Sequence, residues 1–312
     1  MRAEAGKWAK AAGSVLAVVS LLFVAALLWR EREPLLAFRP DASGLAILLA
    51  CVGLYAALGV VLALAWRRLL TWAGEPRVER SEAVTIYART QIAKYIPGNV
   101  AQFAGRQLVG RQAGWSHASL LLSTVFELAS LVFVAGTIAL GAAAAGNQAV
   151  DLRWVLAAMA VVFAAVVCLP VLGPPVLKRL WPGAAVQIGS LRARDLWPVG
   201  LYHALFFLAG GVILVCVAQV VSDQPVPAER WPALVGLFAV AWIVSTLTPG
   251  APSGIGIREL VVVGGLAATM PTSGAILTAA LLRLVTVFGD ALFFLFAMLR
   301  KHGAAQRGIH HG

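Results

Sequence analysis

The sequence predicts an all-α polytopic membrane protein with about seven to eight transmembrane helices and two Pro-Gly-broken or re-entrant segments in a pseudo-repeat. Two observations predict this class. Of the 312 residues, 60% are hydrophobic and only 12% are charged, and the mean hydropathy is +0.85; soluble domains carry about 25% charged residues. Apolar runs of roughly 18 or more residues, long enough to cross a hydrocarbon core about 30 Å thick, recur along the chain.

Seven apolar runs are expected to cross the membrane within a single transmembrane domain that covers residues 1–312. The first run follows Lys7 and Lys10, but it is longer than a typical signal-peptide core and ends without a clear cleavage site, so we expect it to be retained. The polar stretches are too short to build a soluble domain. The expected spans are 11–29, 43–65, 117–141, 153–172, 197–221, 231–247 and 274–299.

The chain is basic, with 25 Lys and Arg residues against 14 Asp and Glu residues and a net charge of +11. The basic residues are scattered between the spans, so we expect no nucleic-acid partner. They concentrate at the termini and in the connections 67–80 and 178–194. We expect a protein of the inner (cytoplasmic) membrane, and the positive-inside rule predicts that both termini lie in the cytoplasm. An even number of crossings follows, so 255–270 is expected to cross as a short or broken eighth span.

Two segments, at about 83–111 and 248–270, share a pattern between apolar spans. The first contains the motif PGNVAQFAGR, whose last residue is Arg106, and the second contains the motif PGAPSGIGIR, whose last residue is Arg258. Pro and Gly at membrane depth release backbone polar groups, which are tolerated only if they are buried in protein or face a wet cavity. Corresponding Pro/Gly interruptions in two halves of a membrane protein point to a transporter binding site.

The pattern also predicts what such a site binds. A helix that restarts after Pro-Gly aims free N–H groups and its positive dipole end at one point, which suits phosphate. The arginine lies about 2.5 turns further on and can hold a phosphate bidentately. In the alternative interpretation the segments are kinks or interfacial loops whose arginines reach the lipid headgroups. The candidate headgroup-binding residues are Lys94, Gly98, Asn99, Arg106, Ser253, Gly254 and Arg258.

Ionisable residues also lie within or beside the apolar runs. Glu127 lies in the span at 117–141, Glu259 follows the second arginine, and Arg283 and Asp290 are seven residues apart on one face of the last span. Charges in a membrane are costly and face a partner or a wet cavity. Two interpretations remain open for all four: structural pairing with an opposite charge, or coupling, in which a carboxylate binds a proton or releases an arginine during transport.

Other chemistries have little support in the sequence. The cysteines, Cys51, Cys168 and Cys216, lie in apolar runs without a CxxC pair, which is typical of small buried residues rather than of a disulfide or zinc site. No nucleophile motif of the GxSxG type, no P-loop and no metal-spaced histidine pair occurs. We therefore expect no catalytic residue, no metal and no cofactor, and a protein that is not an enzyme.

The stretch AKYIPGNVAQFAGR, followed by RQAGWSHASLLLSTVFE, and the later TPGAPSGIGIRE together resemble the signatures of the lysylphosphatidylglycerol synthase transmembrane-region family. In that family a Pro-Gly stretch leads to an Arg and then to a Glu in the next span. A G-x-G-x-R-E stretch precedes an Arg in the last span, here Arg283. The resemblance covers roughly 45–300. The chain differs in having Asn99 where many members have Gly, and in lacking the soluble aminoacyl-transferase domain, so lipid aminoacylation is not expected.

The resemblance implies lipid handling, because similar membrane regions translocate aminoacylated phosphatidylglycerol and relatives act beside glycosyltransferases. The leading hypothesis is a flippase or transporter for a phospholipid or a polyprenyl-phosphate-linked lipid, with an anionic membrane lipid as its partner. Two other hypotheses remain: a non-transporting membrane partner of a glycosyltransferase or lipid-modifying enzyme, and a membrane lipid enzyme such as a phosphatase. The oligomeric state, the lipid, the direction of movement and the energy source are not encoded in any motif.

Overall fold

The computed structural model describes the helical core of the chain and a few residues outside it. Every regular element in this part is helical. The described residues are 38–95, 101–144, 197–222, 224–248, 256–267 and 269–309 (backbone only from 301), with Trp29, Arg153, Leu156, Ala157 and Ala160.

Five described helices are long and apolar enough to cross a membrane, as an all-α multi-pass membrane protein requires. They correspond to five of the seven expected spans. The expected spans 11–29 and 153–172 lie almost entirely outside the described residues. The five helices are α3 (Ala42–Trp72), α6 (His117–Ala144), α9 (Trp197–Val221), α10 (Trp231–Leu247, continuing the short 3-10 helix η3, Ala228–Arg230) and α12 (Thr272–Ile309).

Two of these helices run past the expected ends of their spans. α3 continues to Trp72 rather than ending near residue 65, and Arg67, within its last turns, donates from Nε to the carbonyl of Val78 at 2.8 Å. α12 continues beyond residue 299 to Ile309. A charged residue ends an apolar run but does not stop a helix, whose backbone bonds continue until a capping residue or a turn intervenes.

α3 begins at a capping residue that the sequence places directly before it. The Asp41 carboxylate accepts from the backbone N–H of Gly44 at 2.7 Å and from the Ser43 hydroxyl at 2.7 Å. Both bonds favour the ionised carboxylate, and the Ser43 bond is the larger cause of a lowered Asp41 pKa.

The two segments expected to be broken contain short helices. The first holds α4 (Arg80–Gln91), the 3-10 helix η1 (Ile92–Tyr95) and α5 (Ala101–Gln112), and the second holds α11 (Ile257–Leu266). At a rise of 1.5 Å per residue, the ten residues of α11 span about 15 Å, half of a typical hydrocarbon core. α11 alone therefore cannot cross the membrane.

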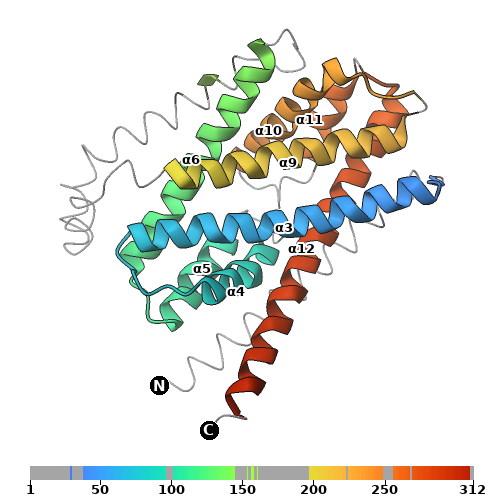
Figure 1. The fold of residues 1–312 in the computed structure, drawn as a ribbon. Helices are drawn as coiled ribbons and strands as arrows, with labels where there is room; N and C mark the ends of the chain where they lie inside the picture. The colour runs from blue at the N-terminus through green and yellow to red at the C-terminus, as the bar shows by residue number, and fades with distance from the viewer. Residues whose placement is uncertain are drawn as a thin grey trace.

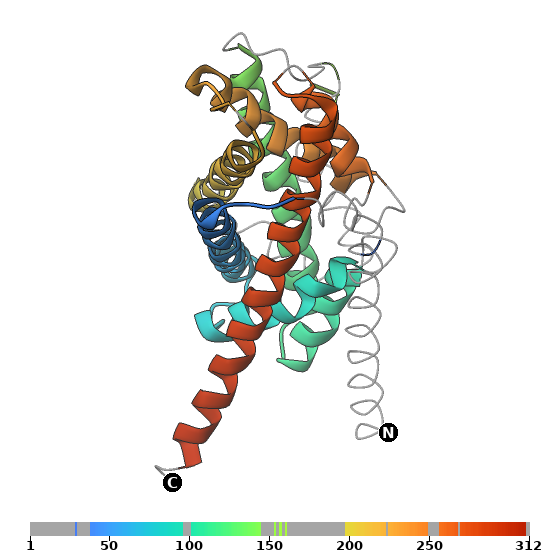
Figure 2. The same ribbon diagram turned by 90° about the vertical axis from the view of Figure 1, so that its right-hand side faces the viewer.

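α12 is the element that connects these segments. It packs against α3 and α9, and it also contacts α11 of the second segment and both α4 and η1 of the first. Figures 1 and 2 show α12 as one long red helix that passes α11 near one end of the molecule and α4 further along. The face of α12 turned to these short helices can therefore meet both segments at once.

The helices that enclose this arrangement approach each other closely. α9 lies against α3 and α10, and α10 lies against α6. At Gly211 of α9 an added Cβ would lie 2.6 Å from the Cα of Val235 on α10, so only glycine fits there. Close approach at small residues is the usual way in which membrane helices pack, because lipid provides no hydrophobic force to join them.

Candidate functional site

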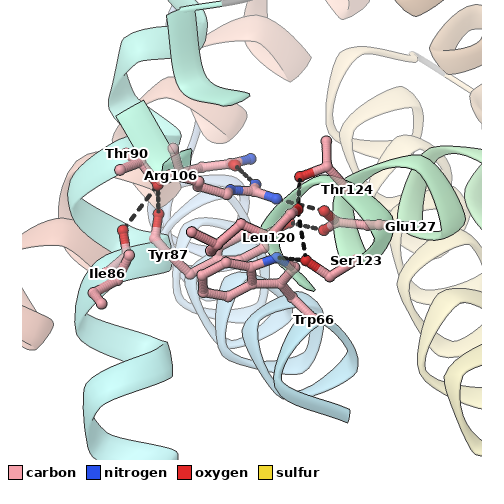
Figure 3. Close-up of polar contacts among 10 residues, drawn as sticks. Trp66, Ile86, Tyr87, Thr90, Arg106, Leu120, Ser123, Thr124 and Glu127 are labelled. Atoms are coloured by element: carbon pink, nitrogen blue, oxygen red, sulfur yellow. Dashed lines mark hydrogen bonds and ion pairs between the residues drawn. The ribbon is translucent and has the colours of Figure 1, made fainter. Parts of the chain in front are cut away.

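The arginine of the first segment lies in a buried ion pair. Arg106, on α5, contacts the carboxylate of Glu127 on α6 through Nη1, and both residues are almost fully buried. The Tyr87 hydroxyl donates to the other Glu127 oxygen at 2.8 Å (Figure 3). Arg106 Nη2 donates to the Gln91 side chain at 3.1 Å. Glu127 therefore has the environment that the structural-pairing interpretation describes.

Aromatic rings surround the same guanidinium. Its carbon lies 3.8 Å from the centroid of the Tyr87 ring, 5.5 Å from that of Trp66 and 5.6 Å from that of Phe103. Trp66 is fixed in turn by a hydrogen bond from its indole N–H to the Ser123 hydroxyl at 3.1 Å (Figure 3). Arg106 thus has its charge matched by Glu127 and its faces covered, and it contributes little free positive charge to a cavity.

Asp290 of α12 binds the end of the first segment. Lys94 Nζ lies 2.5 Å from Asp290 Oδ2, and the Tyr95 hydroxyl donates to the same oxygen at 2.6 Å. The Lys94 ammonium also lies 5.4 Å and 5.8 Å from the ring centroids of Tyr95 and Tyr55. Lys94, an expected headgroup ligand, is therefore held by a carboxylate and two rings.

Arg283 of α12 binds the second segment instead. Its Nε lies 3.6 Å from Glu259 Oε1 on α11, and its guanidinium carbon lies 5.7 Å from the centroid of the Tyr95 ring. Arg283 and Asp290 share a face of α12, as their seven-residue spacing predicts, but each pairs with a different segment. The two ion pairs meet at Tyr95.

Arg258 is the basic residue of this group that forms no ion pair with a carboxylate of the described residues, in contrast to Lys94, Arg106 and Arg283. It lies in the first turn of α11 and is 8% exposed, and its guanidinium carbon lies 5.0 Å from the centroid of the Phe238 ring. Its Nε and Nη2 are buried, and neither has a hydrogen-bond partner among the described residues. A buried guanidinium with two unsatisfied donors is costly, so an acceptor at this point would be stabilised strongly.

A small cavity lies beside Arg258. It is lined by the polar side chains of Arg258, Glu259, Arg283 and Thr286 and by apolar groups of α11 and α12. Its volume of about 10 Å³ is near the least that admits one water molecule. A phosphate group therefore needs a wider form of this cavity than the one described here.

The start of α11 completes the site. Gly256, with a φ of 84°, precedes the helix, and its N–H donates to Glu259 Oε2 at 2.7 Å. The positive φ explains why glycine is required at the second glycine of GIGIRE. The helix N-terminus, with Arg258 in its first turn and Arg283 across the cavity, gives a concentration of positive charge that only Glu259 offsets among the cavity-lining residues.

The structure thus brings Arg258, Glu259 and Arg283 together around one cavity and joins Lys94 and Asp290 to them through Tyr95. Arg106 and Glu127 form a separate buried cluster. Four of the expected headgroup ligands lie outside the described residues: Gly98, Asn99, Ser253 and Gly254.

Sequence reasoning missed the tyrosines and Thr286. Tyr87 and Tyr95 donate to the two buried carboxylates, and Thr286 lines the cavity one turn from Arg283. The available signal was weak. Both tyrosines stand within ten residues of Pro97 in a segment already marked by Lys94, and a tyrosine buried near a membrane carboxylate needs a partner for its hydroxyl.

His203 lies apart from these groups, between α9 and α6. Its Nδ1 is 2.8 Å from the Ser130 hydroxyl, and its ring is fully buried. Since it contacts neither the cavity nor an ion pair of the described residues, it forms no part of the candidate site.

No protein-family model matches the chain, and no curated protein shows a significant match to it. The resemblance to the lysylphosphatidylglycerol synthase transmembrane-region family therefore stays a prediction from the two motifs.

Proposed function

We propose that the protein is a flippase or transporter for a lipid with a phosphate-bearing headgroup, in the cytoplasmic membrane. The headgroup enters the site at the start of α11, and the acyl or prenyl tail stays in the surrounding lipid. The observation that carries the proposal is Arg258, a buried guanidinium with two donors that lack partners, placed at a helix N-terminus. An anionic phosphate oxygen is the acceptor that such a site favours.

The proposal also gives the two broken segments a common role. Lys94 and Asp290 link the first segment to the same α12 face that carries Arg283, so a headgroup that engages Arg283 acts on both segments. The cavity must widen for a phosphate to enter, and this widening is the conformational step of transport. In this proposal the segments are re-entrant or broken spans, and both belong to a bundle of seven to eight crossings.

Transport assays with purified protein in liposomes test the proposal. The wild type is expected to move a fluorescent phospholipid or a polyprenyl phosphate between leaflets, and Arg258→Ala is expected to reduce the rate about tenfold or more, because hydrogen bonds to a charged group are lost. Arg258→Lys should retain only part of the rate, since an ammonium lacks the planar fork.

Arg89→Ala is the matched control. Arg89 is exposed on α4 of the first segment, and its removal should leave the rate unchanged. If a broad lipid panel shows no protein-dependent movement, the transport proposal is wrong. Co-purification of the wild type with a glycosyltransferase, together with an Arg258→Ala variant that functions as well as the wild type, would favour the partner-subunit hypothesis instead.

A further inference from the structure

The Glu259 carboxylate occupies a position between the two groups that a phosphate would use. One oxygen accepts from the Gly256 N–H at 2.7 Å, and the other lies 3.6 Å from Arg283 Nε. A phosphate in the adjoining cavity would draw on the same N-terminal dipole and on the same guanidinium. The carboxylate and the phosphate therefore compete for identical partners.

The geometry of this contact favours exchange. At 3.6 Å the Arg283–Glu259 contact is an ion pair without a good hydrogen bond, and Glu259 Oε1 accepts no hydrogen bond from the part of the chain that the structure describes. The Glu259 side chain is also 24% exposed, against 5% for Arg283. The carboxylate can thus turn outward at lower cost than the buried guanidinium can move, which leaves Arg283 in place for an incoming anion.

The charges that line the cavity also affect how tightly a phosphate binds. Arg258 and Arg283 line the cavity with two positive charges, and Glu259 is the carboxylate among the cavity-lining residues. The negative charge of Glu259 lowers the positive potential that attracts a phosphate. At short range the same charge repels a phosphate that has already bound. A transporter must release its cargo, so a site with two unopposed buried arginines would bind phosphate too tightly for rapid turnover.

We propose that Glu259 is an internal competitor of the phosphate group: it holds Arg283 while the site has no cargo, yields it when a phosphate binds, and takes it back to drive release. This inference rests on the proposed function. It assigns to Glu259 the control of affinity and release, whereas Arg258 and Arg283 are the phosphate ligands.

Glu259→Gln separates this role from helix capping. A glutamine at the third helical position still accepts the Gly256 N–H, as in other capping boxes, but it has no charge to offer Arg283. Purified protein in detergent would be titrated with short-chain phosphatidic acid and, in a second arm, with inorganic phosphate. The variant should bind short-chain phosphatidic acid about tenfold more tightly, since a close like charge has been removed.

Two further readouts follow from the same competition. Without the probe, Glu259→Gln should unfold at a lower temperature than the wild type, because buried Arg283 has lost a carboxylate. Short-chain phosphatidic acid should raise the unfolding temperature of the variant more than that of the wild type. In liposomes the variant should transport more slowly at saturating lipid, because release becomes limiting. Glu79→Gln, an exposed change directly before α4, should match the wild type in both assays.

The binding results distinguish the competitor role of Glu259 from the proposed transport function on which it rests. Equal affinity in the wild type and Glu259→Gln, with binding lost in Arg258→Ala, would overturn the competitor role and leave the proposed function standing. Tighter binding in Glu259→Ala but not in Glu259→Gln would assign the effect to the cap and overturn the inference. Binding of neither probe to any variant would overturn both. Equal affinities for inorganic phosphate and the short-chain lipid would show that the phosphate alone is recognised.

Discussion

At the scale of single residues, the two arginines that share a sequence pattern have different environments. Arg106 is matched by Glu127, Gln91 and aromatic rings, whereas Arg258 has two buried donors that find no partner among the described residues. A position nine residues after a proline is therefore not a sufficient description of either. The carboxylate that a neighbouring helix places against the arginine, which the pattern does not contain, decides whether the arginine is structural or available to a ligand.

Arg106→Met is expected to destabilise the protein by about 3–5 kcal/mol, because Glu127 is left as an uncompensated buried charge. Adding Glu127→Gln should recover a large part of this loss, since the amide is neutral and still accepts from Tyr87. Thermal unfolding of the purified variants in detergent measures both effects. Arg89→Met, an exposed change on α4, is the control. A double variant that is no more stable than Arg106→Met would show that charge compensation is not what Glu127 contributes.

At the scale of elements, the contact between α9 and α10 depends on a glycine. The Cβ of any other residue at Gly211 would meet backbone atoms of α10, which cannot move aside as a flexible side chain can. The pair also carries a cluster of edge-to-face aromatic contacts, among them Phe207 and Trp242, whose ring centroids lie 5.3 Å apart. This contact positions α10, whose Phe238 ring covers the Arg258 guanidinium.

Gly211→Ala should therefore lower stability by about 1–3 kcal/mol through overpacking. The matched control is Gly200→Ala on the same helix, where an added Cβ has nothing within 4 Å. That change should be neutral or stabilising by up to about 1 kcal/mol, because alanine favours a helix. Unfolding temperatures of the two variants give the comparison, and equal losses at both positions would refute the close-packing account.

At the scale of the whole molecule, hydropathy was enough to predict an all-α membrane protein and the five spans that the structure describes. Hydropathy could not predict the helix ends at Trp72 and Ile309. An apolar run ends at the first charged residues, whereas a helix ends where its backbone hydrogen bonds stop. Pattern reasoning marked Lys94, Arg258, Glu259, Arg283 and Asp290 individually. Their pairing depends on how α12 packs against two segments far apart in sequence, which spacing along the chain does not contain.

The charge distribution makes a prediction for the whole chain. The excess of basic residues at both termini predicts that both lie in the cytoplasm. A C-terminal reporter that is active only in the cytoplasm should therefore give signal, and one that is active only outside should not. The reverse result would require an odd number of crossings and would remove the eighth crossing expected at 255–270.

The placement of Arg283 and Asp290 on one face of α12 has a mechanical consequence. Successive residues of a helix are about 100° apart, so turning α12 about its own axis moves both side chains in the same direction. Neither ion pair can be broken by such a rotation while the other is kept, and a state with one pair broken leaves a costly buried charge. Any rotation of α12 therefore acts on both segments together, whereas an outward turn of the Glu259 side chain exchanges the Arg283 contact and leaves the Lys94–Asp290 pair in place.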